Sequence, residues 1–154
     1  DFPIADFNSY GHHPTPNVPS IIGMGKASEI NNDRLQEHLA NAKMLETYLK
    51  KELRSSFNAD INGAEHSKSP YILNVRIPDM PAQLLIEALQ NKVALATGAA
   101  CSSGQKKGSH VLKAMGINAV DIAHSIRIST GFGTRSEEIT QAVNEIMSVK
   151  SITA

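Results

Sequence analysis

Small apolar residues and leucines recur at three- and four-residue intervals in the most regular part of this sequence. The stretch from about Ser20 to Phe57 contains no proline, and its apolar residues fall on one stripe: Leu35, Leu39, Ala42, Leu45, Leu49 and Leu53. A stripe with this period predicts an amphipathic helix whose apolar side faces a core. The chain therefore has to supply a second layer for this long helix to pack on.

Three short segments are predicted to be strands and to form that second layer. They are YILNVRI (71–77), VALAT (93–97) and SIRIST (125–130). All three are rich in β-branched residues. In the last one, Ile126 and Ile128 fall on one face of the strand, while Arg127 and Ser129 fall on the other. Short alternating strands of this kind favour antiparallel pairing with one packed face.

The remaining elements are predicted from helix start signals. Asp79 is expected to cap a helix that follows it, and Ser109 and Asn118 to cap two short helices. Thr134 and Glu137 have the spacing of a capping box before a closing amphipathic helix. The sum predicts an α+β fold, in which helices pack on a small antiparallel or mixed sheet of three or more strands.

Length and composition place the chain among ordinary single domains. Residues 1–19 contain four prolines and read as an irregular lead-in, so the predicted domain is 20–154, with a cysteine loop at 98–108. Fifteen basic residues balance fifteen acidic ones, which argues against direct nucleic-acid or membrane-surface binding. No segment resembles a membrane span or a secretion signal. A lone cysteine fits a reducing compartment, so we expect a cytoplasmic location.

The single cysteine, Cys101, lies in a segment without apolar anchors. Glycines flank it, Lys106 and Lys107 follow, and Ser109 opens a helix whose N-terminus carries partial positive charge. These neighbours favour the thiolate, so the sequence predicts a lowered pKa for Cys101 and a nucleophilic role. The alternative is an exposed thiol without a function, and the residues alone leave both readings open.

A metal site has little support in the sequence. His12, His13 and His110 could join Cys101 as ligands, but no pair of them has the spacing of a zinc-binding motif. We therefore predict no metal.

Several motifs, in order, resemble one known family. They are TPNVPSIIGMGKASEI, SPYILNVRI, PAQLLIEAL, TGAACSSG, SHVLKAMG and HSIRISTGFGTRSEEI, and the resemblance runs from Thr15 to Lys150. Together they are similar to the C-terminal small domain of the pyridoxal-phosphate-dependent cysteine desulfurases of the NifS/IscS kind, in the class-V aminotransferase superfamily. The resemblance implies the small domain of a fold-type I enzyme, and residues 1–19 would be the remnant of the segment joining it to a large domain.

The resemblance also implies roles for three residues. Cys101 matches the nucleophile that takes sulfur from L-cysteine as a persulfide, leaving L-alanine. Arg127 matches the arginine that binds the substrate carboxylate. Thr15 matches a threonine that reaches the cofactor phosphate of the partner subunit in a homodimer, although His12, His13 and Pro14 replace the arginine, serine and glycine usual around it.

The family binds pyridoxal phosphate through a lysine in its large domain, and nothing in this chain resembles that segment. We therefore expect this chain alone to bind no cofactor and to be inactive, and the parent enzyme to hand its sulfur to an acceptor protein. The family serves iron–sulfur cluster assembly, tRNA thiolation and DNA phosphorothioation, and the sequence does not select among them. The alternative is a stand-alone, cofactor-free sulfur-relay or docking module.

Overall fold

The structure of the chain is a computed structural model that describes residues 16–64, 68–97 and 108–153. The chain divides into two units, one ending at Leu35 and the other beginning at Gln36. The elements in chain order are α1 (Val18–Asp33), α2 (Leu35–Phe57), β1 (Asp60–Ile61), β2 (Ile72–Arg76), α3 (Ala82–Leu89), α4 (His110–Ala114), α5 (Ala119–Ala123), β3 (Ser125–Ser129) and α6 (Ser136–Thr153). No helix among the described residues is both long and apolar enough to cross a membrane.

The helical stretch that the sequence predicts as one long element is two helices. Arg34 separates them, with φ −107° and ψ 8°. The residues before it, 31–33, are two asparagines and an aspartate, whose side chains compete for backbone hydrogen bonds and favour helix ends. α1 starts at the N-cap Asn17, whose side chain accepts a hydrogen bond from the Ser20 amide, and it buries none of its residues.

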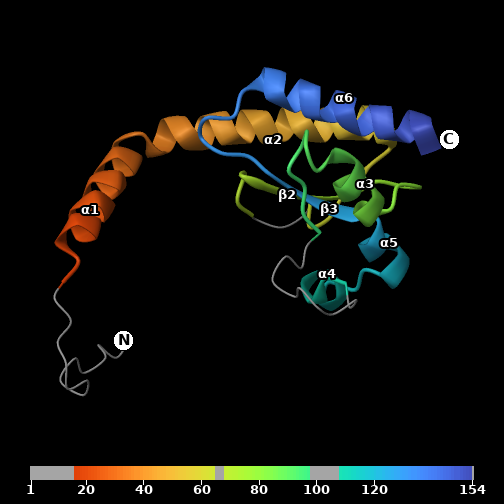
Figure 1. The fold of residues 1–154 in the computed structure, drawn as a ribbon, viewed down its shortest axis with the longest axis horizontal. Helices are drawn as coiled ribbons and strands as arrows, with labels where there is room; N and C mark the ends of the chain where they lie inside the picture. The colour runs from red at the N-terminus through yellow and green to blue at the C-terminus, as the bar shows by residue number, and fades with distance from the viewer. Residues whose placement is uncertain (1–15, 65–67, 98–107, 154) are drawn as a thin grey trace, which may run out of the picture. The chain divides into compact units, whose positions relative to one another are not determined.

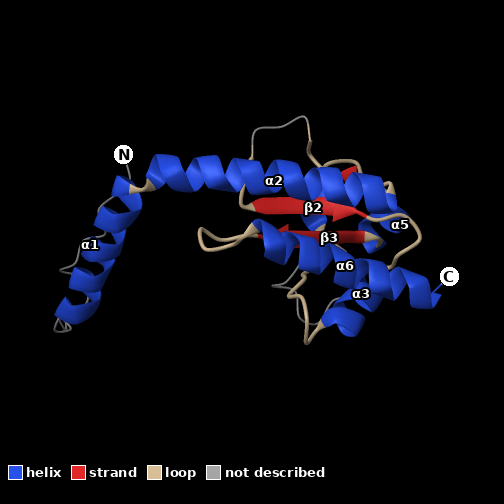
Figure 2. Cartoon of the chain, turned by 90° about the horizontal axis from the view of Figure 1, so that it is seen from above, coloured by secondary structure: helices blue, strands red, loops and turns tan. Residues whose placement is uncertain are grey.

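The sheet has three antiparallel strands in the order β1-β2-β3. Two of them, β2 and β3, are the predicted strands at 71–77 and 125–130, and they run side by side in both views (Figures 1 and 2). The register places Leu73 opposite Ile128, Asn74 opposite Arg127 and Val75 opposite Ile126. This register sorts apolar side chains to one face of the sheet and polar ones to the other, as the alternation predicts.

The predicted strand at 93–97 was wrong, and the sheet contains a strand that was not predicted. Segment 93–97 makes only an isolated bridge between Ala96 and Arg127, because the Val93 amide is still bonded to the Leu89 carbonyl at the end of α3. The third strand is β1, a two-residue strand whose Ile61 is buried in a stretch that otherwise looks polar. A single apolar residue gives no period, so β1 has no signal in the sequence.

Two of the predicted caps are confirmed and two are corrected. Ser109 and Asn118 accept hydrogen bonds from the amides three residues on, in α4 and α5. Asp79 caps nothing, because it adopts φ 60° and Pro81 precedes α3 without a side-chain cap. Thr134 instead accepts a hydrogen bond from the Gly131 amide, and it is Glu138 that reaches back to the Arg135 amide at the start of α6.

The core lies on one face of the sheet, under α2, α3 and α6 (Figure 1). Tyr48 on α2 and Thr140 on α6 are joined by a hydrogen bond of 2.8 Å between their hydroxyls, which fixes these two helices to each other. Of the predicted stripe, Ala42, Leu45, Leu49 and Leu53 are buried in the core, and so is Phe57 beyond it. The start of the stripe was predicted wrongly, because Leu35 is exposed and Leu39 is only half-buried. With one face of the sheet covered in this way, the functional residues have to be sought on the other.

Shortening a buried side chain of the apolar stripe on α2 should destabilise the fold. Leu53 is fully buried, whereas Met44 on the same helix is 57% exposed. Leu53→Ala is expected to lower the free energy of unfolding by about 2–5 kcal/mol because it leaves a cavity. Met44→Ala is the matched control, with an expected change of about 0.5 kcal/mol or less. Urea unfolding followed by circular dichroism measures both, and equal effects would contradict the assignment of α2 to the core.

Candidate functional site

Arg127, the predicted carboxylate-binding residue, lies in the middle of β3 on the polar face of the sheet. Its cross-strand neighbour on one side is Asn74 of β2. On the other side its backbone pairs with Ala96: the Arg127 amide donates to the Ala96 carbonyl over 2.6 Å, and the Ala96 amide donates back over 3.3 Å. The Arg127 side chain is half-buried and makes no hydrogen bond or ion pair with another described residue.

Cys101 and Thr15, the other two predicted site residues, lie outside the described residues. Described residues close to each end of the cysteine segment are near Arg127. Ala96, just before it, pairs with Arg127, and Ser109, just after it, lines the same hollow as Arg127.

A hollow of about 190 Å³ opens on the polar face beside Arg127. Its described lining combines apolar side chains of α4 and its C-cap with polar side chains from β2, β3, the turn after β1 and the N-cap of α4: Val111, Leu112, Met115, Asn74, Arg127, Asn62 and Ser109. Among the described residues of this lining, Arg127 is the only charged one. An unpaired guanidinium beside apolar walls binds an anion well, because it presents several donors in one plane and the walls restrict water.

A hydrogen-bonded network of asparagine and serine side chains borders the hollow. The Asn62 side-chain amide donates to Asn74 Oδ1 over 2.6 Å and to Ser125 Oγ over 3.0 Å. Ser125, which is buried, donates to the Asp121 carbonyl over 2.7 Å. The sequence reading missed these residues, although Asn74 is visible as a polar residue within the apolar strand ILNVR and could have been noticed there.

Two ionisable groups of the described chain have pKa values shifted from the ordinary range, and neither lines the hollow. The pKa of Arg76 is raised, first by its hydrogen bond to Asp60 and further by Asp121. Burial lowers the pKa of Lys68, with Lys50 adding repulsion and Glu46 opposing both. Arg76 thus neutralises the acidic residues on this face of the sheet, and it leaves Arg127 without a carboxylate partner among the described residues.

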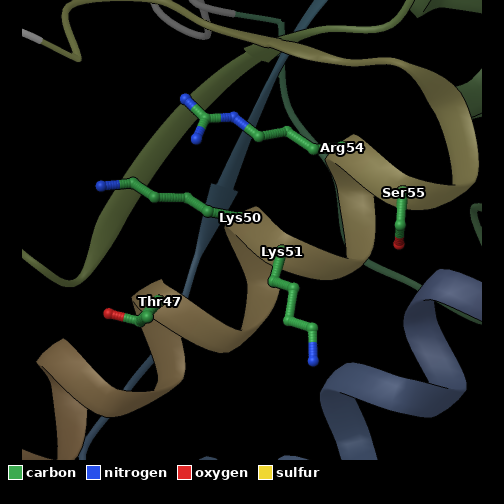
Figure 3. A pocket seen from close by; sticks show the side chains of 5 residues that line it. All are labelled: Thr47, Lys50, Lys51, Arg54 and Ser55. Atoms are coloured by element: carbon green, nitrogen blue, oxygen red, sulfur yellow. The ribbon is translucent and has the colours of Figure 1, made fainter.

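A second hollow, of about 570 Å³, lies on the outer side of α2 and is lined by Thr47, Lys50, Lys51, Arg54 and Ser55 (Figure 3). Figure 3 shows Lys50 and Arg54 extending to one side of the helix and Lys51 to another. Lys50 is already paired with Glu46 at 2.7 Å. The sequence assigned no functional role to any of these residues, and α2 covers the opposite face of the sheet from Arg127. Within the described ranges, no three His, Cys, Asp or Glu side chains gather as metal ligands.

Comparison of the sequence and the fold with known proteins defines the class of protein. The sequence profile of the aminotransferase class-V family matches residues 4–142, so this chain belongs to that family. Its solved structural neighbours are NifS-like proteins. One described as a NifS-like protein superposes with a TM-score of 0.78 at 26% identity, over 91% of this chain and 35% of that one. Another, from Rickettsia africae ESF-5, gives a TM-score of 0.76 at 26% identity.

Several proteins with similar sequences carry the name cysteine desulfurase. The chain is 33% identical over 147 residues to the cysteine desulfurase IscS of Anaeromyxobacter sp. (strain K), and the match covers 91% of this chain and 36% of that protein. It is 30% identical over 138 residues to the putative cysteine desulfurase IscS 1 of Bacillus subtilis (strain 168). The chain spans about a third of the length of the relatives it matches.

The network beside the hollow should contribute to stability as well as to geometry. Ser125→Ala removes an acceptor of Asn62 and a donor to the Asp121 carbonyl in a buried place. We expect it to lower the free energy of unfolding by about 1–3 kcal/mol. Ser129→Ala, at an exposed position on the same strand, is the control and should change it by about 0.5 kcal/mol or less. Thermal denaturation of both variants tests this, and an unaffected Ser125→Ala would contradict the network.

Proposed function

We propose that this chain is the sulfur-accepting and carboxylate-binding part of a cysteine desulfurase, which converts L-cysteine to L-alanine and passes the sulfur to an acceptor protein. The observation that carries the proposal is the hollow around Arg127, the one cation in its described lining. Ser109, just after the Cys101 segment, lines this hollow, and Ala96, just before the segment, pairs with Arg127. Membership of the aminotransferase class-V family and the names of the relatives support the same reaction.

Arg127 is proposed to bind the carboxylate of L-cysteine. A guanidinium can donate two parallel hydrogen bonds to a carboxylate, which fixes the orientation of the substrate as well as its position. The apolar side chains of α4 that line the hollow limit water around this pair, and a lower local polarity strengthens it.

Cys101 is proposed to be the nucleophile that accepts the sulfur. It is five residues beyond Ala96, so the chain allows at most about 18 Å between them, and Ala96 pairs with Arg127. This chain length is compatible with a thiol that reaches a substrate held by Arg127. The bond that forms joins Cys101 Sγ to the substrate sulfur, and the bond that breaks is the substrate's carbon–sulfur bond. The electron pair of the broken bond stays on the carbon, which takes up a proton, and the carbon skeleton leaves as alanine.

The family implies pyridoxal phosphate, but the described residues do not fit the whole of its site. The described lining of the hollow around Arg127 contains no lysine, and a lysine is what holds this cofactor. We propose that the cofactor is held by the part of the protein that corresponds to the unmatched two-thirds of the relatives, with Thr15 reaching its phosphate across a homodimer. Residues 1–154 alone would then be inactive. The enzyme that contains them is also proposed to be cytoplasmic.

The role of Cys101 predicts a specific loss. In the full-length enzyme with its cofactor, Cys101→Ser should abolish persulfide formation because a hydroxyl cannot hold the transferred sulfur. Intact-mass measurement after incubation with L-cysteine detects the gain of one sulfur atom, and Ser103→Ala is the control that should keep it.

Two results would contradict this assignment, and a third would favour the alternative. A persulfide that still forms in Cys101→Ser would move the nucleophile elsewhere. Alanine release by residues 1–154 alone would place the whole reaction in this chain. A persulfide that appears on residues 1–154 only after a separate cofactor-bearing protein is added would favour a sulfur-relay module.

The role of Arg127 predicts weaker substrate binding with little change in folding. Arg127→Lys keeps the charge and loses the paired donors, so we expect the KM for L-cysteine to rise about 10-fold or more. Arg135→Lys, an arginine on the same chain that is 76% exposed, is the matched control. Steady-state kinetics of the full-length enzyme measures both, and an unchanged KM in Arg127→Lys would exclude Arg127 as the carboxylate ligand.

A further inference from the structure

The direction of every hydrogen bond in the network beside the hollow is fixed by one backbone carbonyl. The Asp121 carbonyl can only accept, so the single hydroxyl proton of Ser125 points to it. Ser125 Oγ is then left to accept, and the group facing it at 3.0 Å has to be the Asn62 NH₂. The same nitrogen lies 2.6 Å from the Asn74 side chain, which must therefore turn its oxygen toward Asn62.

This direction determines which atom Asn74 leaves for the hollow. Its oxygen is used by Asn62, and its NH₂ group makes no hydrogen bond with another described residue. Asn74 lines the hollow and is the cross-strand partner of Arg127. Side chains directly opposite each other on one face of an antiparallel pair have Cβ atoms about 5 Å apart, so a single small ligand can contact both.

The hollow therefore offers an anion two sets of donors. The Arg127 guanidinium supplies charged N–H groups and the Asn74 amide supplies neutral ones, and the described lining residues include no carboxylate side chain that would compete for them. A carboxylate has about four lone-pair positions, more than one guanidinium satisfies. A second donor is thus chemically useful at this place.

We propose that the Asn74 side-chain NH₂ is a second hydrogen-bond donor to the substrate carboxylate that Arg127 binds. This inference rests on the proposed function, since it takes the ligand of the hollow to be the carboxylate of L-cysteine. Asn62 and Ser125 act through Asn74 as positioning residues, because they hold its amide in the orientation that presents nitrogen and not oxygen.

The test is Asn74→Asp in the full-length enzyme with its cofactor. Aspartate has the same shape and still accepts from Asn62, but it turns a negatively charged oxygen to the hollow in place of NH₂. The KM for L-cysteine should rise at least about 10-fold, because a donor to a charged group is lost and a repulsion is gained. Asn74→Ala removes the donor without adding charge, and it should give a smaller rise in the same direction.

A ligand without a carboxylate separates binding from structural damage. Cysteamine has the amine and thiol of cysteine and no carboxylate, so its inhibition constant should be unchanged in Asn74→Ala, while that of L-alanine rises. Equal weakening of both ligands would overturn the inference and make Asn74 structural. Loss of the folded state in both Asn74 variants, seen by circular dichroism, would have the same meaning.

Arg127→Lys, measured beside these variants, distinguishes the two proposals. A raised KM in Arg127→Lys with an unchanged KM in Asn74→Asp would overturn the role of Asn74 and leave the proposed function standing. An unchanged KM in Arg127→Lys as well would mean that the hollow does not bind the substrate carboxylate, and the proposed function itself would fall.

Discussion

The structure depends on the alternation of side chains along β2 and β3. Leu73, Val75 and Ile126 point to a face that is wholly covered by helices, and this burial fixes the register, because a slip by one residue would exchange the two faces. The same register sets Asn74 opposite Arg127 on the other face. The apolar core therefore places the polar site, and no separate device is needed to bring these two residues together.

The parts of the fold that the sequence predicts are those with a period. The α2 stripe and the strands around Val75 and Ile126 repeat often enough to distinguish helix from strand, and the structure confirms them. β1 and the bridge at Ala96 involve one or two residues each and depend on neighbours far along the chain. Such local pairing is decided by tertiary contacts, and for this reason it could not be predicted from periodicity.

Only a part of the candidate site could be predicted from the sequence. Arg127 could be singled out as a candidate because it falls on the polar face of an alternating strand and because the surrounding motif resembles a known family. Asn62 and Ser125 could not be, since their importance comes from hydrogen bonds between residues 63 positions apart. The resemblance to cysteine desulfurases gave no information on them either, because it supplied roles for single residues and not the contacts that orient those residues.

The polar face of the sheet carries two arginines, Arg76 and Arg127, of which only Arg76 forms an ion pair with another described residue. Arg76 is paired with both Asp60 and Asp121, so the carboxylates nearest to this part of the sheet are already neutralised. Asp121 is held in turn by Asn118 at the start of α5, and its carbonyl sets the direction of the network that ends at Asn74. One short helix thus serves two purposes: it keeps acidic groups bound to Arg76, and it turns a donor toward the hollow. The whole chain has a net charge of zero, which is compatible with an anion site. On this face Asp60 and Asp121 are paired with Arg76, and Arg127 is left unpaired among the described residues.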